Sequence, residues 1–154
     1  LYGAGDAKVG SIVGGGAKDG KRLKTKFLNN TPSLRDLRER VAKAAKRGYI
    51  KGLDGRRIWI RSEHAALNSL LQGAGAVVMK KALTILDACA TMAGLDYKFV
   101  GNIHDEYQVE VLKEHADKFG VLAVDAIRQA GQEFEMRCPL DGEYKVGLTW
   151  AETH

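Results

Sequence analysis

The segment GNIHDEYQVEV, residues 101–111, places an imidazole and two carboxylates between two stretches that alternate like β-strands. Because Asp and Glu are depleted in strand interiors, His104, Asp105 and Glu106 are expected at a hairpin turn, where carboxylates project away from the sheet. Mg²⁺ prefers oxygen ligands and is usually held by one or two carboxylates, waters and substrate phosphates. This acidic pair therefore predicts part of a metal site, with ordinary turn residues as the alternative.

A second polar group lies on a helix that the apolar pattern predicts from Glu63 to Met92. His64, Asn68 and Gln72 are spaced four residues apart and form one polar stripe on this helix. Uncharged donors of this kind can contact A N3 and T O2 in the minor groove of DNA with little regard to sequence. The alternative is that the stripe is the solvent face of an amphipathic helix.

Basic residues concentrate in the first part of the chain. Residues 1–63 hold 16 Lys and Arg against 6 Asp and Glu, whereas residues 64–154 hold 8 against 13. This asymmetry indicates a polyanionic partner for the first part, or else solvated helix faces. Arg56 and Arg57, after the Asp54–Gly55 turn, and Arg61 on the next strand are candidates for phosphate contacts.

The elements that must position these residues follow from periodicity and turn signals. The glycine-rich first thirty residues predict short helices broken by turns, and GxxxxGK[ST] does not occur in them. A helix is predicted after Thr31 as N-cap and Pro32 as the first helical residue, with Gly48 as its stop. Further predictions are a hairpin around Asp54–Gly55 with Trp59 in its half-buried second strand, a hairpin over 97–112, a helix over roughly 114–135 and a closing edge strand over 143–150. In the second hairpin, Tyr97, Phe99, Ile103, Tyr107, Val109 and Val111 are expected on one buried face.

Composition excludes several classes of protein. With 45% hydrophobic residues, 154 residues can form one domain with a real core, and no uninterrupted apolar run approaches the ~20 residues of a membrane helix. The N-terminus lacks the basic start and apolar centre of a signal peptide, so no membrane partner and an intracellular location are expected. Cys89 and Cys138 have no ligand spacing and predict ordinary thiols.

Taken together, three segments resemble the C-terminal part of family A DNA polymerases, most of all the podovirus-type phage enzymes. They are LYGAGDAKVG, KGLDGRRIWIRSEHAALNSLLQGAGA and GNIHDEYQVEV, in the order and approximate spacing of that family, and the closing WAETH is similar too. The resemblance implies an α+β fold: a palm-type antiparallel sheet with long helices packed on one face, plus helices of a partial fingers subdomain. It implies partial fingers over residues 1–48 and the C-terminal part of the palm over 49–154.

The resemblance also assigns roles to the site residues. The HDE segment resembles motif C, in which Asp105 is one of the two carboxylates that hold paired Mg²⁺ ions, and Glu106 and His104 shape the site beside the primer end. The family's reaction is two-metal nucleotidyl transfer to a primer 3′-hydroxyl. The helix of His64, Asn68 and Gln72 resembles the palm helix that contacts primer and template. Arg56, with Arg61 nearby, is implied in DNA binding, and Tyr2, the final tyrosine of motif B, in nucleotide binding.

The sequence departs from the family pattern at its start. The arginine, lysine and first tyrosine of motif B are absent, as is motif A with its catalytic aspartate. The expected function is therefore a C-terminal fragment or split subunit of a DNA-directed DNA polymerase, inactive alone and dependent on an upstream polypeptide. The expected partners are primer–template DNA, dNTP, that polypeptide and a processivity factor, in the cytoplasm of a host cell. The alternative is a non-catalytic DNA-binding remnant or module that uses the basic N-terminal half.

Overall fold

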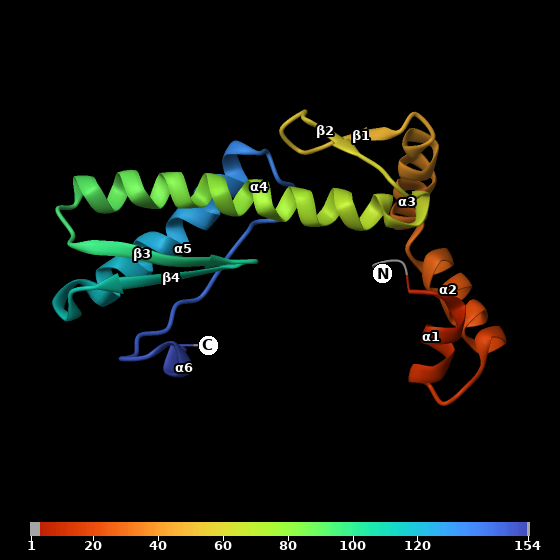
Figure 1. Ribbon diagram of the computed structural model, residues 1–154, viewed down its shortest axis with the longest axis horizontal. Coiled ribbons are helices and arrows are strands. Elements are labelled where there is room, and N and C mark those ends of the chain that lie inside the picture. Colours follow the sequence, from red (N-terminus) through yellow and green to blue (C-terminus); the bar gives the residue numbers. More distant parts are fainter. Residues whose placement is uncertain (1–3, 154) are drawn as a thin grey trace. The chain divides into compact units, whose positions relative to one another are not determined.

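The computed structural model describes residues 4–153, apart from the side chain of His64. The chain divides into two compact units between Gly73 and Ala74, and helix α4, Glu63–Met92, runs through this division (Figure 1). The predicted α+β class is confirmed, since the elements are helices and two separate antiparallel hairpins. The boundary between fingers and palm after Gly48 stays a prediction.

The first unit begins with three helices, of which the first two lie in the glycine-rich region where short helices were predicted. They are α1, Asp6–Ile12, α2, Ala17–Asn30, and α3, Pro32–Ala45. Helices α1 and α2 approach closely because Gly20 has no side chain: a Cβ there would lie 1.9 Å from the carbonyl oxygen of Asp6. Lys24 of α2 adds an ion pair to Asp6, with Nζ 2.8 Å from Oδ1.

The predicted boundaries of α3 are confirmed. Thr31 occupies the N-cap position and Pro32 begins the helix, and the chain turns at Gly48 with a φ of +83°. One detail differs, because the Thr31 hydroxyl donates to the carbonyl oxygen of Phe27 at 2.7 Å and makes no capping bond to α3. The Thr31 side chain therefore provides a hydrogen bond for a carbonyl group in the last turn of α2. Pro32 can start α3 without a capping bond of its own, because proline has no N–H group that needs an acceptor.

The predicted hairpin around Asp54–Gly55 forms from β1, Tyr49–Lys51, and β2, Arg57–Trp59. It covers the first turns of α4 and the end of α3, where the buried core residues of this unit meet. They are Val41, Ala45, Ile50, Ala66 and Leu67. This core holds the N-terminal end of α4, which carries the polar stripe.

The second unit places the HDE hairpin on helices. Strands β3, Tyr97–Ile103, and β4, Glu106–Val111, pair antiparallel. A 3₁₀ turn, η1, Lys113–His115, leads into α5, Ala116–Glu133, so the predicted helix is confirmed with a tighter first turn. The core joins Leu86 and Ala90 of α4 with Phe119 and Ala126 of α5, and aromatic and valine side chains of the hairpin pack on it.

A β-bulge at Val100 changes the expected faces of the hairpin. Phe99 pairs with Val109, but Gly101 pairs with Gln108, so Val100 is an extra residue in β3 and is 67% exposed. Directly opposed residues share a face, and Ile103 pairs with Glu106. The prediction that Ile103 lies on the buried face was therefore wrong, because the bulge reverses the alternation before Ile103 is reached.

The predicted edge strand over 143–150 was also wrong. No strand is assigned to these residues, and the segment after α5 runs extended along that helix to α6, Trp150–Thr153. Side chains hold it there: the Tyr144 ring lies so close to Gly120 that a Cβ on that glycine would be 2.2 Å from Cδ2. The segment therefore docks on a helix and adds no backbone ladder to the sheet.

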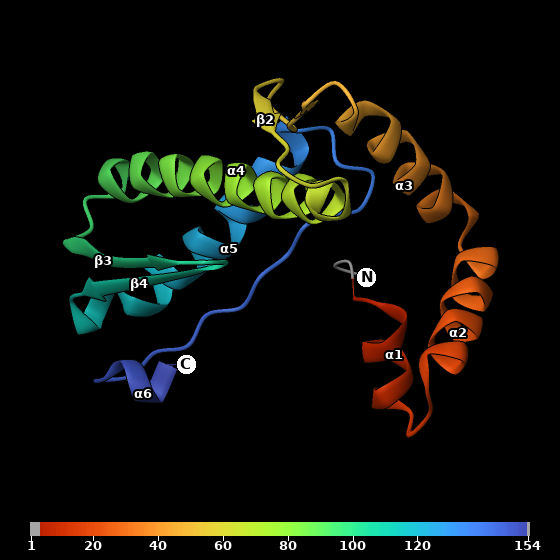
Figure 2. The ribbon, with the colours of Figure 1, turned by 45° about the vertical axis from the view of Figure 1, so that its right-hand side comes forward.

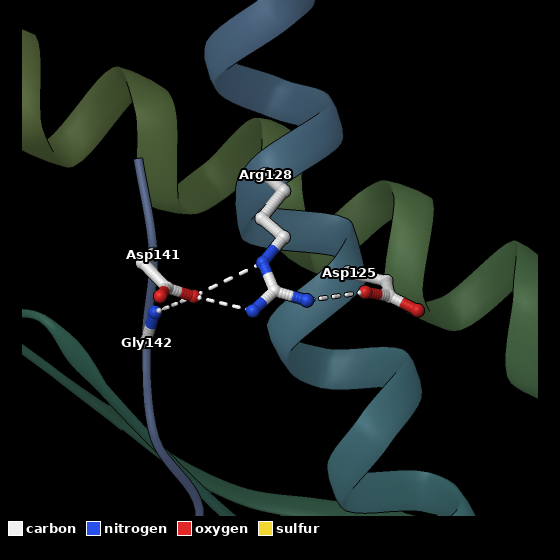
Figure 3. A network of polar contacts seen from close by, with 4 residues as sticks. All are labelled: Asp125, Arg128, Asp141 and Gly142. Carbon is white, nitrogen blue, oxygen red and sulfur yellow. Dashed lines mark hydrogen bonds and ion pairs between the residues drawn. The ribbon is translucent and has the colours of Figure 1, made fainter. Parts of the chain in front are cut away.

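Arg128 of α5 binds the extended segment that follows α5 through ion pairs and hydrogen bonds (Figure 3). Its Nε lies 3.0 Å from Asp141 Oδ1 and one terminal nitrogen lies 2.9 Å from Asp125 Oδ1. The two carboxylates, Asp125 first, raise the pKa of Arg128 above its usual value. Asp141 Oδ1 also accepts the Gly142 N–H at 2.9 Å, so one carboxylate oxygen joins helix and extended segment.

Among the described residues, Ala65–Met92 of α4 has the length and composition of a membrane-crossing helix, with a mean hydropathy of 1.2. Core helices of water-soluble proteins can have the same length and composition. In this unit Leu86 and Ala90 are buried under the hairpin and α5, and Lys81 pairs with Glu133 of α5 at 2.6 Å. The C-terminal half of α4 therefore packs in the core of this unit, and 17% of the apolar stretch is buried.

The contact between the Tyr144 ring and Gly120 can be used to test whether the segment docks on α5. Gly120→Ala should lower the free energy of unfolding by about 1–3 kcal/mol, because the new methyl group forces the ring away. Gly75→Ala is the matched control, because nothing lies within 4 Å of its Cβ position and alanine favours a helix by roughly 0.5–1 kcal/mol. Urea denaturation measures both, and equal effects of the two changes would contradict the docking.

Candidate active site

The HDE turn lies at the end of the β3–β4 hairpin. Ile103 and Glu106 form the last pair, so His104 and Asp105 are the two turn residues. His104 has a φ of +54°, a left-handed conformation that glycine usually adopts at the first position of such turns. Both turn residues are exposed, so Asp105 lies at an exposed turn as the sequence predicts. The backbone thus accepts local strain where two of the predicted catalytic side chains lie.

Tyr107 joins this turn to α4. Tyr107 is the second residue of β4, and its hydroxyl donates to the carbonyl oxygen of Met79. Burial raises the pKa of Tyr107 to about 12. At the other end of the hairpin, the Tyr97 hydroxyl donates to Asp87 Oδ1 at 2.6 Å, and this bond raises the pKa of Tyr97. Two tyrosines therefore fix both ends of the hairpin to one helix.

The side chain of Glu106 belongs to the other face of the hairpin. Glu106, Gln108 and Ile103 share this face by their pairing, and Gln108 Nε2 donates to Glu106 Oε1. In both views the hairpin lies between α4 and the short helix α6 (Figures 1 and 2). The two carboxylates of the HDE segment thus differ: Asp105 is at the exposed turn, and Glu106 is half-buried on a strand.

The chemistry of these carboxylates fits a divalent cation in part. Asp105 supplies an exposed carboxylate, the ligand type that Mg²⁺ prefers. Within residues 4–153, however, no group of three or more His, Cys, Asp or Glu side chains is arranged to hold a metal ion. Asp105 by itself therefore supplies one carboxylate ligand, and a bound cation would need further ligands.

The polar stripe lies on α4, which is one continuous helix as predicted. Gln72 is exposed, and Asn68 is half-buried with an Oδ1 atom that has no hydrogen-bond partner among the described residues. An unsatisfied buried amide oxygen is unusual and suits a site that another molecule completes. The side chain of His64 and all of Tyr2 lie outside the described residues, so their predicted roles stay predictions.

The predicted arginines are placed on the surface of the first unit. Arg56 is held by Asp54, whose Oδ2 lies 2.5 Å from its Nε. Arg61 is exposed and follows β2 instead of lying on it, which corrects the predicted strand position. Trp59, expected to be half-buried, is 70% exposed and meets Tyr49 edge-on at 5.7 Å. A three-residue strand without a second covering layer leaves that ring in solvent.

A basic groove on α2 was not singled out from the sequence. It is wide open to solvent, with a volume of about 570 Å³, and lies on one helix face. Its lining residues are Lys18, Lys21, Arg22, Thr25, Lys26, Asn29 and Asn30. The signal in the sequence is their spacing of three to four residues, which aligns them on one side of a helix once its bounds are known.

Comparison with known proteins identifies the class to which this fold and turn belong. The family described as DNA polymerase family A matches residues 1–152. The chain belongs to this family. It is 42% identical over 176 aligned positions to the DNA-directed DNA polymerase of Enterobacteria phage T3, covering 100% of this chain and 25% of that protein. For the enzyme of Escherichia phage T7 the identity is 40%, with the same coverage.

A more distant relative and a solved structure agree with this assignment. DNA polymerase I of Aquifex aeolicus is 30% identical over 95% of this chain and 26% of its own length. The POL domain of Pol1 from M. smegmatis, in complex with DNA primer-template and dNTP, matches with a TM-score of 0.75 and 25% identity, over 84% of this chain and 25% of that one. The chain spans about a quarter of the length of the curated relatives it matches.

Tyr107 gives a test of how the turn is supported. Its folded-state pKa of about 12 lies above the ordinary value of 10.0, so the folded protein holds this proton more tightly than the unfolded chain. The resulting stabilisation is complete below pH 10 and is lost as the pH rises through about 12. Tyr107→Phe should cost about 1 kcal/mol at pH 8 and reduce the alkaline loss of stability.

Chemical denaturation between pH 8 and pH 11.5 measures both effects. Tyr49→Phe is the control, because it removes a tyrosine hydroxyl from the first unit and leaves the Tyr107 hydroxyl on Met79. An unchanged alkaline slope in Tyr107→Phe would show that this hydroxyl does not support the hairpin.

Proposed function

We propose that this chain supplies the palm hairpin of a template-directed DNA polymerase, which adds deoxynucleotides to a primer 3′-hydroxyl. The observation that carries the proposal is the exposed carboxylate of Asp105 at a two-residue turn, on a hairpin fixed to α4 by Tyr107, in a chain of DNA polymerase family A. The ligands of the solved relative, a DNA primer-template and a dNTP, are the proposed substrates.

Each site residue of this chain is proposed to have its own role in the reaction. Asp105 would hold Mg²⁺ together with waters and substrate phosphates, and Glu106 would orient groups beside it. When bound, the two ions would favour ionisation of the primer hydroxyl and neutralise charge on the triphosphate. His104, at the exposed turn, shapes the site beside the primer end, and Tyr2 contacts the incoming nucleotide.

The first unit supplies contacts to duplex DNA in this proposal. Asn68 and Gln72, with His64, face the minor groove, where their N–H groups donate to A N3 and T O2. Arg56 and Arg61 contact phosphates, where exposed guanidinium groups act with little regard to sequence. For Arg56, this contact competes with its ion pair to Asp54.

One carboxylate cannot hold two ions, so activity requires ligands outside these 154 residues. We propose that a polypeptide carrying motif A and the start of motif B provides them, as part of the same chain or as a separate subunit. A processivity factor and a location in the host cytoplasm complete the proposal, since DNA and dNTPs are present there.

Asp105→Asn tests the assignment in the polymerase that carries this segment. Loss of the charge without change of shape should lower kcat for primer extension by at least about 10³-fold, or ~4 kcal/mol of barrier, while DNA affinity changes little. Glu110→Gln is the matched control, because it removes an exposed carboxylate from the same hairpin. Full activity of Asp105→Asn would refute the role given to this residue.

A second candidate function is DNA binding without catalysis, favoured by the basic groove on α2. Four basic side chains line it, and Asp19 pairs with one of them, Arg22, at 3.7 Å. Exposed cations on one helix face can follow a phosphate backbone and release its counterions on binding.

The salt dependence of DNA affinity tests this candidate. Each phosphate neutralised lowers log K by about 0.9 per decade of salt, so changing Lys18, Lys21 and Lys26 to Gln should reduce the slope by up to about 3. The control changes Lys98, Lys118 and Lys145 to Gln, which alters net charge equally in the second unit. Fluorescence anisotropy at several salt concentrations measures both, and equal slopes for the two triple variants would exclude α2 as the binding face.

A further inference from the structure

A chain of side-chain hydrogen bonds connects Glu106 with the helix at the end of the described chain. Gln108 Nε2 donates to Glu106 Oε1, and the Thr153 hydroxyl of α6 lies within donating distance of two oxygens, Gln108 Oε1 at 3.3 Å and Trp150 O at 3.1 Å. Both contacts of Gln108 are partly buried, and the one with Thr153 joins residues 45 positions apart in the sequence. Glu106 is thus connected to a distant segment through a single amide.

Chemistry decides how this amide is oriented. A carboxylate only accepts hydrogen bonds, so the NH₂ group of Gln108 must face Glu106. Its carbonyl oxygen then faces Thr153, whose hydroxyl can donate. The two ends of the amide have different partners, and a rotation by 180° would put two acceptors together at Glu106. Glu106 therefore selects the orientation of the Gln108 amide, and the Thr153 hydroxyl, which can donate or accept, is compatible with it.

Hydrogen bonds and one close contact stabilise the turn that carries Thr153. Leu148 N–H donates to Glu152 Oε2 at 2.7 Å, and Glu152 N–H donates to Thr149 O at 3.1 Å. Gly147 allows the turn to close, since a Cβ there would lie 2.7 Å from Glu152 Cβ. These contacts within residues 147–152 hold the turn in shape independently of its contact with Gln108.

We propose that Gln108 and Thr153 are positioning residues of the active site. Thr153 holds the Gln108 amide, and Gln108 holds the Glu106 carboxylate in one rotamer next to Asp105. Without the Gln108 bond, Glu106 loses one of the interactions that orient its carboxylate and occupies its productive geometry for less of the time. The consequence for nucleotide addition rests on the function proposed above, whereas the hydrogen-bonded chain itself does not.

A double-mutant cycle in the polymerase that carries this segment tests the connection. Thr153→Val removes the hydroxyl with little change of shape and should lower kcat for primer extension by roughly three- to tenfold, with KM for dNTP changed less than about twofold. Gln108→Leu should lower kcat by about tenfold or more. In the Gln108→Leu background, Thr153→Val should have no further effect, because the amide through which it acts is gone.

Two further variants separate positioning from a general effect on the C-terminal turn. Thr153→Ser keeps the hydroxyl and should retain most of the activity. Leu148→Ala changes a side chain in the same turn that is 93% exposed, and should leave kcat unchanged. Independent, additive losses from Gln108→Leu and Thr153→Val, or a loss in Leu148→Ala equal to that of Thr153→Val, would overturn the proposal.

Hydrogen exchange gives a readout that does not depend on activity. Thr153→Val and Gln108→Leu should each speed amide exchange in residues 104–109 several-fold, and Leu148→Ala should not. If the wild-type polymerase failed to extend primers, the proposed function would be wrong, and the exchange pattern would still test the hydrogen-bonded chain. Unchanged exchange in both Thr153→Val and Gln108→Leu would overturn it.

Discussion

The β-bulge at Val100 is the constraint on which the geometry of the site depends. Before it, Tyr97 pairs with Val111 and Phe99 with Val109, and this register continued would pair Ile103 with Asp105. A single residue would then remain for the turn. The extra residue shifts the register by one, so Ile103 pairs with Glu106 and His104 and Asp105 form a two-residue turn.

The same bulge assigns the side chains of the hairpin to two faces. Tyr107, Val109 and Val111 face the helices, where Tyr107 donates to α4 and the valines join the core. Glu106 and Gln108 face the opposite side, where Thr153 of α6 contacts Gln108. One face therefore provides rigidity and the other provides polar contacts to the carboxylate next to the turn. Asp105 lies at the tip between them.

Glycines and one arginine bring the C-terminal segment to this second face. Tyr144 packs on Gly120 of α5, and Arg128 joins Asp141 to the same helix (Figure 3). The segment ends in α6. Helix α5 therefore contributes to the core and also provides the surface on which the segment packs as it returns to the hairpin. A segment that paired as an edge strand would not present Thr153 in this way.

Much of the fold was predictable because the signals are local. Alternation and turn residues gave both hairpins, Pro32 and Gly48 bounded α3, and apolar periodicity gave α4 with its bounds, since each signal acts within a few neighbouring residues. The position of Asp105 at a turn and the continuous helix under Asn68 and Gln72 followed in the same way. The family resemblance, carried by three motifs in order, was confirmed by the match over residues 1–152.

Tertiary structure decided what depends on contacts between distant residues. The bulge that moved Ile103 to the other face has no marker in an alternating pattern, because one extra residue changes parity without changing composition. The failed edge strand over 143–150 has the same origin: Tyr144 packs on Gly120 of α5, Val146 and Leu148 stay exposed, and packing overrode local propensity. The contact of Thr153 with Gln108 spans 45 positions, and only the folded chain brings those two side chains together. The amino-acid sequence by itself thus determined the family, the elements and the carboxylate at the turn, whereas the fold decided which groups hold that turn and its neighbour Glu106 in place.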